Sequence, residues 1–384
     1  MMDKSIYFDN AATTFPKPRE VYDFADTFYR NYGVNAGRGK YKLAQKANEL
    51  IYDTRKECLS LFHVTNEKEI VFTHSATEAI NMILRGLRYD KIKSVYISPF
   101  EHNAVLRTLY DLQKKHKFSI IMLDVENNGN SYCLEKIIEG FKKSPPDLVV
   151  LSHASNTNGL IAPYKEIFQE AKKYTAYTML DIAQTAGFID IDLSAHEIDF
   201  AVFAGHKTLF APLGIGGFVF KRNIPITPLI SGGTGYHSIE RDMPDLIPEK
   251  FEAGSLNIYA IAGLYASIKW IKDMQICNIR KREQELMDEL IAILSSYKNL
   301  RMFVGAQSVS IVSCIFDNYS PDEMGYILSK KNICVRTGLH CAPLAHEALG
   351  SLPTGTVRFS LSYFNTKDDL YTLDKELKYI RDYT

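Results

Sequence analysis

An acid and a lysine each follow an apolar segment in the middle of the chain. Asp181 closes the segment 177–181, and Lys207 comes shortly after the segment 199–203. Both segments predict buried strands, and ligands of open parallel sheets bind beyond the carboxyl ends of the strands. Pyridoxal phosphate suits this pair, because a lysine forms a Schiff base with it and an acid pairs with its pyridinium nitrogen. The two residues alone leave open an ordinary ion pair at the edge of a sheet.

Hydroxyl residues stand where another predicted strand, 70–73, gives way to a predicted helix, 77–87. These residues are Ser75 and Thr77. Hydroxyl and backbone N–H groups at a helix N-terminus can bind a phosphate group. Helix capping is an equally good local interpretation of the same residues.

Two further predicted strands are followed by polar side chains. His102 follows the segment 94–98, and an imidazole there can stack on a planar ring and exchange protons. Asn156 follows the segment 148–152 and can bond a ring substituent. A surface or capping role for His102 is the alternative, and His153 is expected to pack structurally.

One of the six cysteines has neighbours that the other five lack. Cys341 follows His340 directly and Arg336 by five residues, in a segment that predicts a turn. Nearby cations favour a reactive thiolate, so Cys341 is the candidate nucleophile. Arg358 lies in a predicted strand among apolar residues, where its planar fork can hold a substrate carboxylate or form a structural ion pair.

Composition narrows the class of protein. The chain has 384 residues and a formal net charge of zero, which gives no indication of a nucleic-acid or anionic-membrane partner. The cysteines form no CxxC pair, so neither a metal site nor a disulfide framework is expected. No apolar run approaches the roughly 20 residues of a membrane span, and residues 1–5 contain no apolar signal core. A cytoplasmic location is expected.

Strand and helix patterns alternate through most of the chain. Such alternation predicts an α/β fold with a mostly parallel sheet flanked by helices. The segment 214–220 predicts one further strand, of antiparallel sense, and the pattern after residue 256 predicts a smaller α+β unit. We expect an N-terminal segment (1–16) that packs with the small domain, a large domain (17–256) and a small C-terminal domain (257–384) that carries Cys341.

In this order, the segments resemble the class V aminotransferase family of fold-type I pyridoxal-phosphate enzymes, and within it the cysteine desulfurases with a short cysteine loop. The resemblance spans nearly the whole chain, and the fold it implies has a seven-stranded type of sheet. It is carried by Tyr7-Phe8-Asp9-Asn10-Ala11-Ala12, Asp181-Ile182-Ala183-Gln184, Gly205-His206-Lys207, Phe251-Glu252-Ala253-Gly254-Ser255 and Arg336-Thr337-Gly338-Leu339-His340-Cys341.

The resemblance implies a role for each matching residue. Lys207 attaches pyridoxal 5'-phosphate, Asp181 pairs with its ring nitrogen and His102 stacks on the ring. The ring oxygen is implied to contact Gln184 and Asn156, and the phosphate group to contact Ser75, Thr77 and His206. Ser255 is implied to reach the phosphate of a partner subunit. Arg358, with help from Arg38 and Asn156, binds the substrate. Two alanines, Ala76 and Ala204, replace hydroxyl residues found in some relatives.

The implied reaction converts L-cysteine to L-alanine and leaves a persulfide on the catalytic residue Cys341, with Lys207 and His102 moving protons. A homodimer and a protein sulfur acceptor are implied partners, and iron–sulfur cluster assembly is one possible destination for the sulfur. Alternatives are a selenocysteine lyase, another activity of the same family or a non-catalytic scaffold. These alternatives do not require Cys341, whereas a desulfurase does, so activity without Cys341 would distinguish them.

Overall fold

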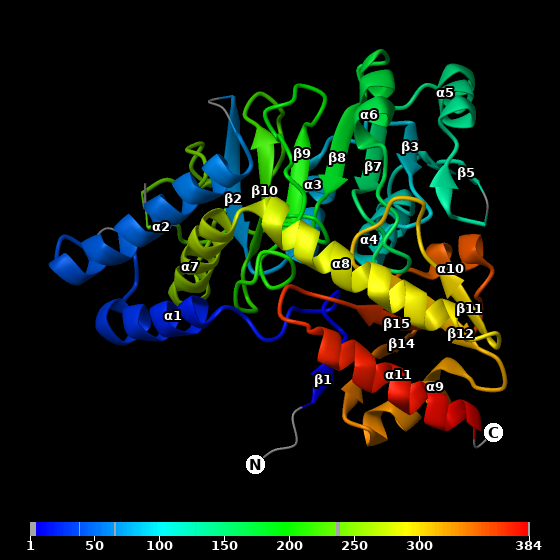
Figure 1. Ribbon diagram of the computed structural model, residues 1–384. Coiled ribbons are helices and arrows are strands. Elements are labelled where there is room, and N and C mark those ends of the chain that lie inside the picture. Colours follow the sequence, from blue (N-terminus) through cyan, green and yellow to red (C-terminus); the bar gives the residue numbers. More distant parts are fainter. Residues whose placement is uncertain (1–4, 38, 65–66, 127, 236–238, 383–384) are drawn as a thin grey trace.

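The computed structural model describes residues 5–37, 39–64, 67–126, 128–235 and 239–382 (Figure 1). The helices are α1 (Arg19–Tyr32), α2 (Lys42–Leu61), α3 (Ala76–Gly86), α4 (Asn103–Gln113), α5 (Leu134–Lys143), α6 (Tyr164–Lys172), α7 (Ile258–Met274), α8 (Ile276–Ser295), α9 (Pro321–Lys330), α10 (Pro343–Leu349) and α11 (Lys367–Asp382). The strands are β1 (Ile6–Tyr7), β2 (Lys68–Thr73), β3 (Ser94–Ile97), β4 (Ser119–Met122), β5 (Val125–Glu126), β6 (Ser131–Tyr132), β7 (Leu148–Ser152), β8 (Tyr177–Asp181), β9 (Phe200–Ala204), β10 (Gly216–Lys221), β11 (Leu300–Phe303), β12 (Ile311–Phe316), β13 (Ile333–Cys334), β14 (Arg336–Gly338) and β15 (Thr356–Ser360).

A seven-stranded sheet forms the centre of the larger part of the molecule. Its order is β2-β10-β9-β8-β7-β3-β4, and only β10 runs antiparallel to its neighbours. The predicted α/β class, the mostly parallel sheet and the antiparallel strand after residue 214 are therefore confirmed. The carboxyl ends of β7, β8 and β9 lie side by side, which brings the residues that follow them to one edge.

Both faces of this sheet are buried because successive side chains of a strand point to opposite sides. In β9, Phe200 and Val202 pack with α3 and α4, whereas Ala201 and Phe203 pack with α2, α5, α6 and α7. This two-sided burial explains the nearly unbroken apolar runs of the central strands.

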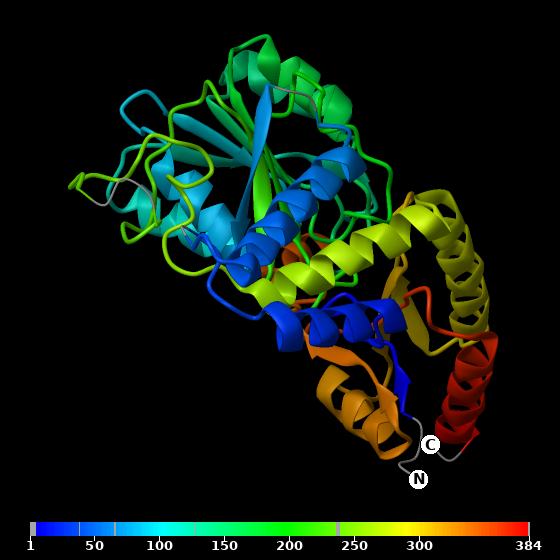
Figure 2. The same cartoon turned by 90° about the vertical axis from the view of Figure 1, so that its left-hand side faces the viewer.

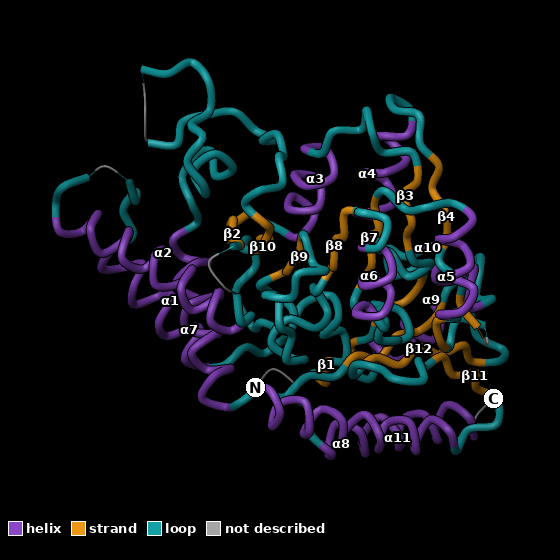
Figure 3. Tube along the Cα trace, turned by 90° about the horizontal axis from the view of Figure 1, so that it is seen from above, coloured by secondary structure: helices purple, strands orange, loops and turns teal. Residues whose placement is uncertain are grey.

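A second sheet, of order β11-β12-β15-β14, forms the core of the C-terminal part. Helices α8 and α11 contact each other along one flank of the molecule (Figure 3). The sequence patterns did not predict β11, α10 or the small hairpin of β5 and β6. Near the N-terminus, β1 pairs in parallel with β13, so the start of the chain joins the C-terminal part.

Helix α7 packs against α1 and α2 (Figure 2), and its buried side chains belong to the core of the larger part. The core around the second sheet begins at Leu286 in α8. The division of the chain at residues 16 and 256 stays a prediction. None of the described helices is long and apolar enough to cross a membrane.

The Asp199 side chain connects α6, β8 and β10, so we expect its removal to lower the stability of the fold by a large amount. It is 3% exposed, pairs with the amines of Lys172 and Lys221, and accepts the backbone N–H of Thr178 at 2.9 Å. Asp199→Ala leaves two partly buried amines without a counter-charge, so we expect the free energy of unfolding to fall by about 3–5 kcal/mol. Urea unfolding measures this change.

The matched control is Asp23→Ala, because Asp23 pairs with Arg19 at an exposed position of α1. This variant should lose less than about 1 kcal/mol. Equal losses in the two variants would contradict the structural role of Asp199.

Candidate active site

A cavity of about 270 Å³ lies at the carboxyl edge of the large sheet, where the second sheet approaches it. It gathers most of the site residues predicted from the sequence: Ser75, Thr77, His102, Asn156, Asp181, Gln184, His206, Lys207, Cys341 and Arg358. Ala76 and Ala204 also line it. Ser255 does not line this cavity and is exposed, and Arg38 lies outside the described residues.

Asp181 and Lys207 face this cavity from neighbouring strand ends. Asp181 is buried, and the one hydrogen bond to its carboxylate in the described structure comes from the backbone N–H of Ala183 to Oδ1, at 2.9 Å. Burial raises the pKa of Asp181 and lowers the pKa of Lys207, and each charge partly offsets the effect of burial on the other. A buried carboxylate with a free oxygen fits a protonated ring nitrogen.

Gly205 allows Lys207 to take this place. A Cβ atom on Gly205 would lie 2.8 Å from Cγ2 and 2.9 Å from the carbonyl oxygen of Ile215, closer than real Cβ contacts. The backbone N–H of Gly205 donates to that same carbonyl at 3.0 Å. A side chain at this position would push β9 away from β10 and displace the following lysine.

The residues predicted to hold a phosphate group lie around the start of α3. Ser75 caps this helix, since its Oγ accepts the backbone N–H of Glu78 at 3.2 Å. The capping interpretation is thus correct, and the hydroxyl hydrogen of Ser75 stays available to a phosphate oxygen. His206 Nδ1 is buried and has no hydrogen-bond partner in the described structure, while burial lowers the pKa of His206 to about 4. A ring nitrogen without a partner at this place can carry the proton of the neutral imidazole and donate it to an anionic group.

His102 is the N-cap of α4, and this contact fixes its tautomer. Its Nδ1 accepts the backbone N–H of Ala104 at 3.0 Å. Burial, followed by the charge of Lys207, lowers the pKa of His102 to about 4. A neutral His102 therefore carries its proton on Nε2.

Asn156 makes contacts that its sequence position did not predict. Its side-chain Nδ2 donates to the backbone carbonyl oxygen of His340 at 2.7 Å. Its own backbone carbonyl oxygen accepts from Arg358 Nη1 at 2.9 Å. Asn156 thus joins the cavity-lining Arg358 to the turn before Cys341. Gln184 Nε2 donates to the carbonyl oxygen of Ala11 at 2.9 Å, which leaves its amide oxygen for a ligand.

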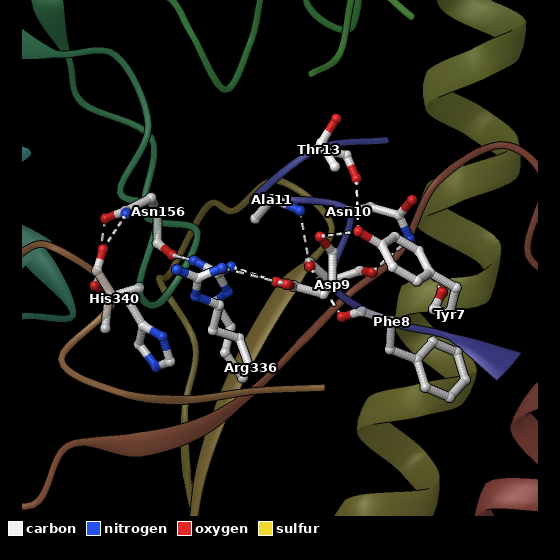
Figure 4. A network of polar contacts seen from close by, with 12 residues as sticks. Tyr7, Phe8, Asp9, Asn10, Ala11, Thr13, Asn156, Arg336 and His340 are labelled. Atoms are coloured by element: carbon white, nitrogen blue, oxygen red, sulfur yellow. Dashed lines mark hydrogen bonds and ion pairs between the residues drawn. The ribbon is translucent and has the colours of Figure 1, made fainter. Parts of the chain in front are cut away.

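An acid from the N-terminal segment lies between two arginines at the cavity (Figure 4). Asp9 Oδ1 accepts from Arg358 Nη2 at 2.7 Å, and its Oδ2 lies 3.6 Å from Arg336 Nη1. Arg358 is 2% exposed and its Nε has no partner in the described structure. The guanidinium is therefore held on one side by Asp9 and keeps a free N–H for a carboxylate.

The sequence interpretation missed Asp9 as a site residue and considered Arg336 only as a cation near Cys341. Both lie in the quoted segments Tyr7–Ala12 and Arg336–Cys341, but Asp9 was read only as part of a turn. Nothing in the local pattern connects position 9 to position 358.

Cys341 is exposed and lies in a turn, as predicted. His340 and Cys341 both have left-handed backbone angles, with φ of 49° and 59°. His340 is not the cation that the sequence suggested beside the thiol. Its Nε2 lies 2.8 Å from Thr356 Oγ1, and burial lowers its pKa to about 2. The positively charged residues that line the same cavity as Cys341 are Lys207, Arg336 and Arg358.

Comparison with known proteins identifies the family to which the chain belongs. Residues 6–373 match the model of the family described as "Aminotransferase class-V". A protein of Methanothermobacter thermautotrophicus named "Probable cysteine desulfurase" is 32% identical over 382 residues, which cover 98% of this chain and 94% of that protein. One of Pyrococcus abyssi with the same name is 31% identical over 383 residues, covering 96% and 92%.

A solved structure has the same fold over nearly its whole length. The apo structure of a cysteine desulfurase from Thermococcus onnurineus NA1 superimposes with a TM-score of 0.89 at 28% identity, covering 98% of this chain and 94% of that one.

The buried histidine next to this cavity, His153, predicts one measurable pH effect. Its Nδ1 lies 2.9 Å from Thr185 Oγ1, and burial lowers its pKa to about 3. The ordinary value is about 6.5, so below that pH the unfolded chain binds a proton that the folded chain does not. The contribution of His153 to stability is therefore lost as the pH falls, by about 1 kcal/mol between pH 7.5 and pH 5.5.

The test compares His153→Asn with the unchanged protein in urea at both pH values. The amide keeps a hydrogen-bonding group beside Thr185 but does not titrate in this range. We expect the free energy of unfolding of the variant to fall by about 1 kcal/mol less than that of the unchanged protein. An identical fall in both would show that His153 is not held neutral.

Proposed function

Because this chain belongs to the class V aminotransferase family, we infer that it is a pyridoxal-phosphate-dependent cysteine desulfurase. The relatives named above share this activity by name and match nearly the whole chain. One observation carries the inference further than family membership does. Lys207, Asp181 and an exposed cysteine, Cys341, line the same cavity, and transamination or racemisation has no use for the cysteine.

We propose that the cofactor is held by residues at the sheet edge. Lys207 would bind its aldehyde carbon, Asp181 its ring nitrogen, His102 one ring face and Gln184 its ring oxygen. Ser75, Thr77 and His206 would hold the phosphate group. The unpartnered Nδ1 of His206 and the free oxygen of Asp181 support this assignment. When bound, pyridoxal phosphate supplies an electron sink that makes the Cα proton of an amino acid acidic.

Substrate binding would depend on Arg358. Its buried guanidinium already donates to Asp9 and to the carbonyl of Asn156, so the remaining donors, including Nε, would take the α-carboxylate of cysteine. Arg336 and Arg358 together carry two positive charges, and Asp9 cancels one of them. The single positive charge that remains matches the single negative charge of the substrate carboxylate. Arg38, predicted to assist, lies outside the described residues.

Two side chains are placed to move protons. Burial lowers the pKa of Lys207, so a larger share of its amine is neutral and can take the Cα proton. His102 holds its proton on Nε2, because Nδ1 accepts from Ala104. It would therefore donate a proton at Nε2 but could not accept one there while neutral.

Cys341 would take the sulfur atom. Its thiolate attacks the sulfur of the substrate, a new S–S bond forms, and the bond between the substrate's Cβ and its sulfur breaks. A proton then replaces sulfur at Cβ. Two thiols thus become alanine and a persulfide on Cys341, with no external oxidant or reductant.

We propose a homodimer as the working form. Ser255 is exposed and outside the cavity of its own chain, so it is available to a second copy. Exposed aromatic side chains on α1, α2 and α7 offer an apolar surface for such a contact, namely Tyr22, Tyr29, Tyr52 and Tyr259. We further propose that the enzyme is cytoplasmic, since its cysteines are free thiols. It would pass sulfur to an acceptor for pathways such as iron–sulfur cluster assembly.

Mass spectrometry tests the role of Cys341. After incubation with L-cysteine, the peptide that contains Cys341 should carry one additional sulfur atom, and alanine should appear. Cys341→Ser should reduce alanine formation at least about 100-fold, because the nucleophile is lost. Cys277→Ser is the matched control, since Cys277 is also exposed but lies outside the cavity. An unmodified Cys341 in a protein that makes alanine would contradict the assignment.

Visible absorbance tests the role of Lys207. Lys207→Ala should abolish the absorption band of the lysine-bound cofactor, because no other amine lines the described cavity. Lys173→Ala removes an exposed amine and should keep the band. A band that survives in Lys207→Ala would assign the cofactor to another lysine.

A further inference from the structure

Cys341 borders a second hollow besides the cavity that holds Asp181 and Lys207. This outer groove has a volume of about 540 Å³, within the roughly 300–1,000 Å³ of ligand sites. It shares Arg336, His340 and Cys341 with the inner cavity, but no other lining residue. The groove-lining residues used below are Asn103, Arg107, Arg336, Thr337, Leu339 and Cys341. A thiol between two spaces can receive sulfur from one and release it to the other.

The backbone around Cys341 is held from both sides. The N–H of Asn103 donates to the carbonyl oxygen of Cys341 at 2.7 Å, and Asn156 Nδ2 donates to the carbonyl oxygen of His340 at 2.7 Å. The N–H of Ala342 closes the turn by donating to the carbonyl oxygen of Leu339 at 2.8 Å. This leaves rotation of the side chain as the main freedom of the sulfur. A molecule that takes the sulfur must therefore come to the groove.

The outer groove is positively charged. Arg107 lies one helical turn after Asn103 on the same face of α4, is exposed, and has no ion-pair partner in the described structure. Arg336 is 47% exposed, and its one carboxylate contact within the described residues is Asp9, at 3.6 Å. No acidic residue lines the groove. A second acid beside the lining residues is Asp322, whose Oδ1 accepts from the hydroxyl of Thr337 at 2.7 Å.

We propose that this groove binds an acceptor protein through a segment in which carboxylate side chains flank the receiving cysteine, with Arg107 and Arg336 as their partners. The proposal rests on the proposed desulfurase function and specifies, in addition, that the docking segment of the sulfur acceptor is negatively charged. The transfer is an exchange between thiols. The acceptor thiolate attacks the outer sulfur of the Cys341 persulfide and bonds to it. The S–S bond to Cys341 breaks, and Cys341 leaves as a thiolate, so no net oxidation occurs.

The test uses the full-length holoenzyme with its persulfide already formed from L-cysteine and the excess cysteine removed. Three short peptides with blocked ends serve as probes, each with a central cysteine flanked on both sides by glutamates, by serines or by lysines. Loss of the persulfide and gain of one sulfur by the peptide are followed by mass spectrometry. Flanking charges also change the reactivity of a thiol. Each rate constant is therefore divided by that of the same peptide with neutral 2,2'-dithiodipyridine.

We expect the glutamate peptide to exceed the lysine peptide by about 10-fold at low ionic strength, because exposed ion pairs contribute up to about 1 kcal/mol each. The preference should shrink at high salt. Arg107→Glu leaves Arg336 and one introduced carboxylate in the groove, whose charges cancel. The ratio of the glutamate-peptide rate to the lysine-peptide rate should therefore be close to one. Lys114→Ala removes a positive charge from the end of the same helix, outside the groove, and should keep the ratio of the unchanged protein.

Equal normalised rates for the three peptides would overturn the proposal, as would a ratio that survives in Arg107→Glu. A persulfide that never forms with L-cysteine would instead contradict the proposed function. Because the ratios are taken on persulfide that is already present, a slower first half-reaction in a variant does not affect them.

Discussion

The Asp9 carboxylate holds the cavity-lining Arg358 in place, and much of the site depends on this contact. Arg358 is almost fully buried, and a buried guanidinium without a counter-charge costs several kcal/mol. Asp9 supplies that charge at 2.7 Å from the N-terminal segment. The same segment pairs with β13 through β1 and contacts β15 through Ser360, whose Oγ accepts the N–H of Ala11 at 2.9 Å. The start of the chain therefore fixes the geometry of a residue near its end.

This arrangement explains why the cavity lies where two sheets meet. The large sheet contributes the acid and the lysine at its carboxyl edge, where a parallel sheet exposes the ends of its strands. The second sheet contributes Arg358 from β15, and the turn after β14 contributes Cys341. Cofactor chemistry and sulfur chemistry thus come from different parts of the fold. The Asp9 contact and the Asn156 contacts hold those parts in register.

The central sheet could be predicted from the sequence because its strands are buried on both faces and read as apolar runs. The predicted strand 148–152 agrees with β7 to the residue. Short elements gave too little pattern, so α10 and the hairpin of β5 and β6 were missed. The Asp9–Arg358 pair was missed for another reason. It joins residues 349 positions apart, and only the pairing of β1 with β13 and the packing on β15 bring them together.

Asn156 shows how one residue can serve both halves of the site. Its carbonyl oxygen accepts from Arg358, and its amide donates to the carbonyl of His340. Arg358 is therefore linked to the turn that carries Cys341 through one residue, by its backbone carbonyl on one side and its side-chain amide on the other. His340 and Cys341 both have left-handed backbone angles, which non-glycine residues adopt only where their surroundings hold them. The contacts of Asn156, Asn103 and Thr356 provide that hold. Cys341 is thus kept in position by the residue that also contacts Arg358, and it remains open to the outer groove.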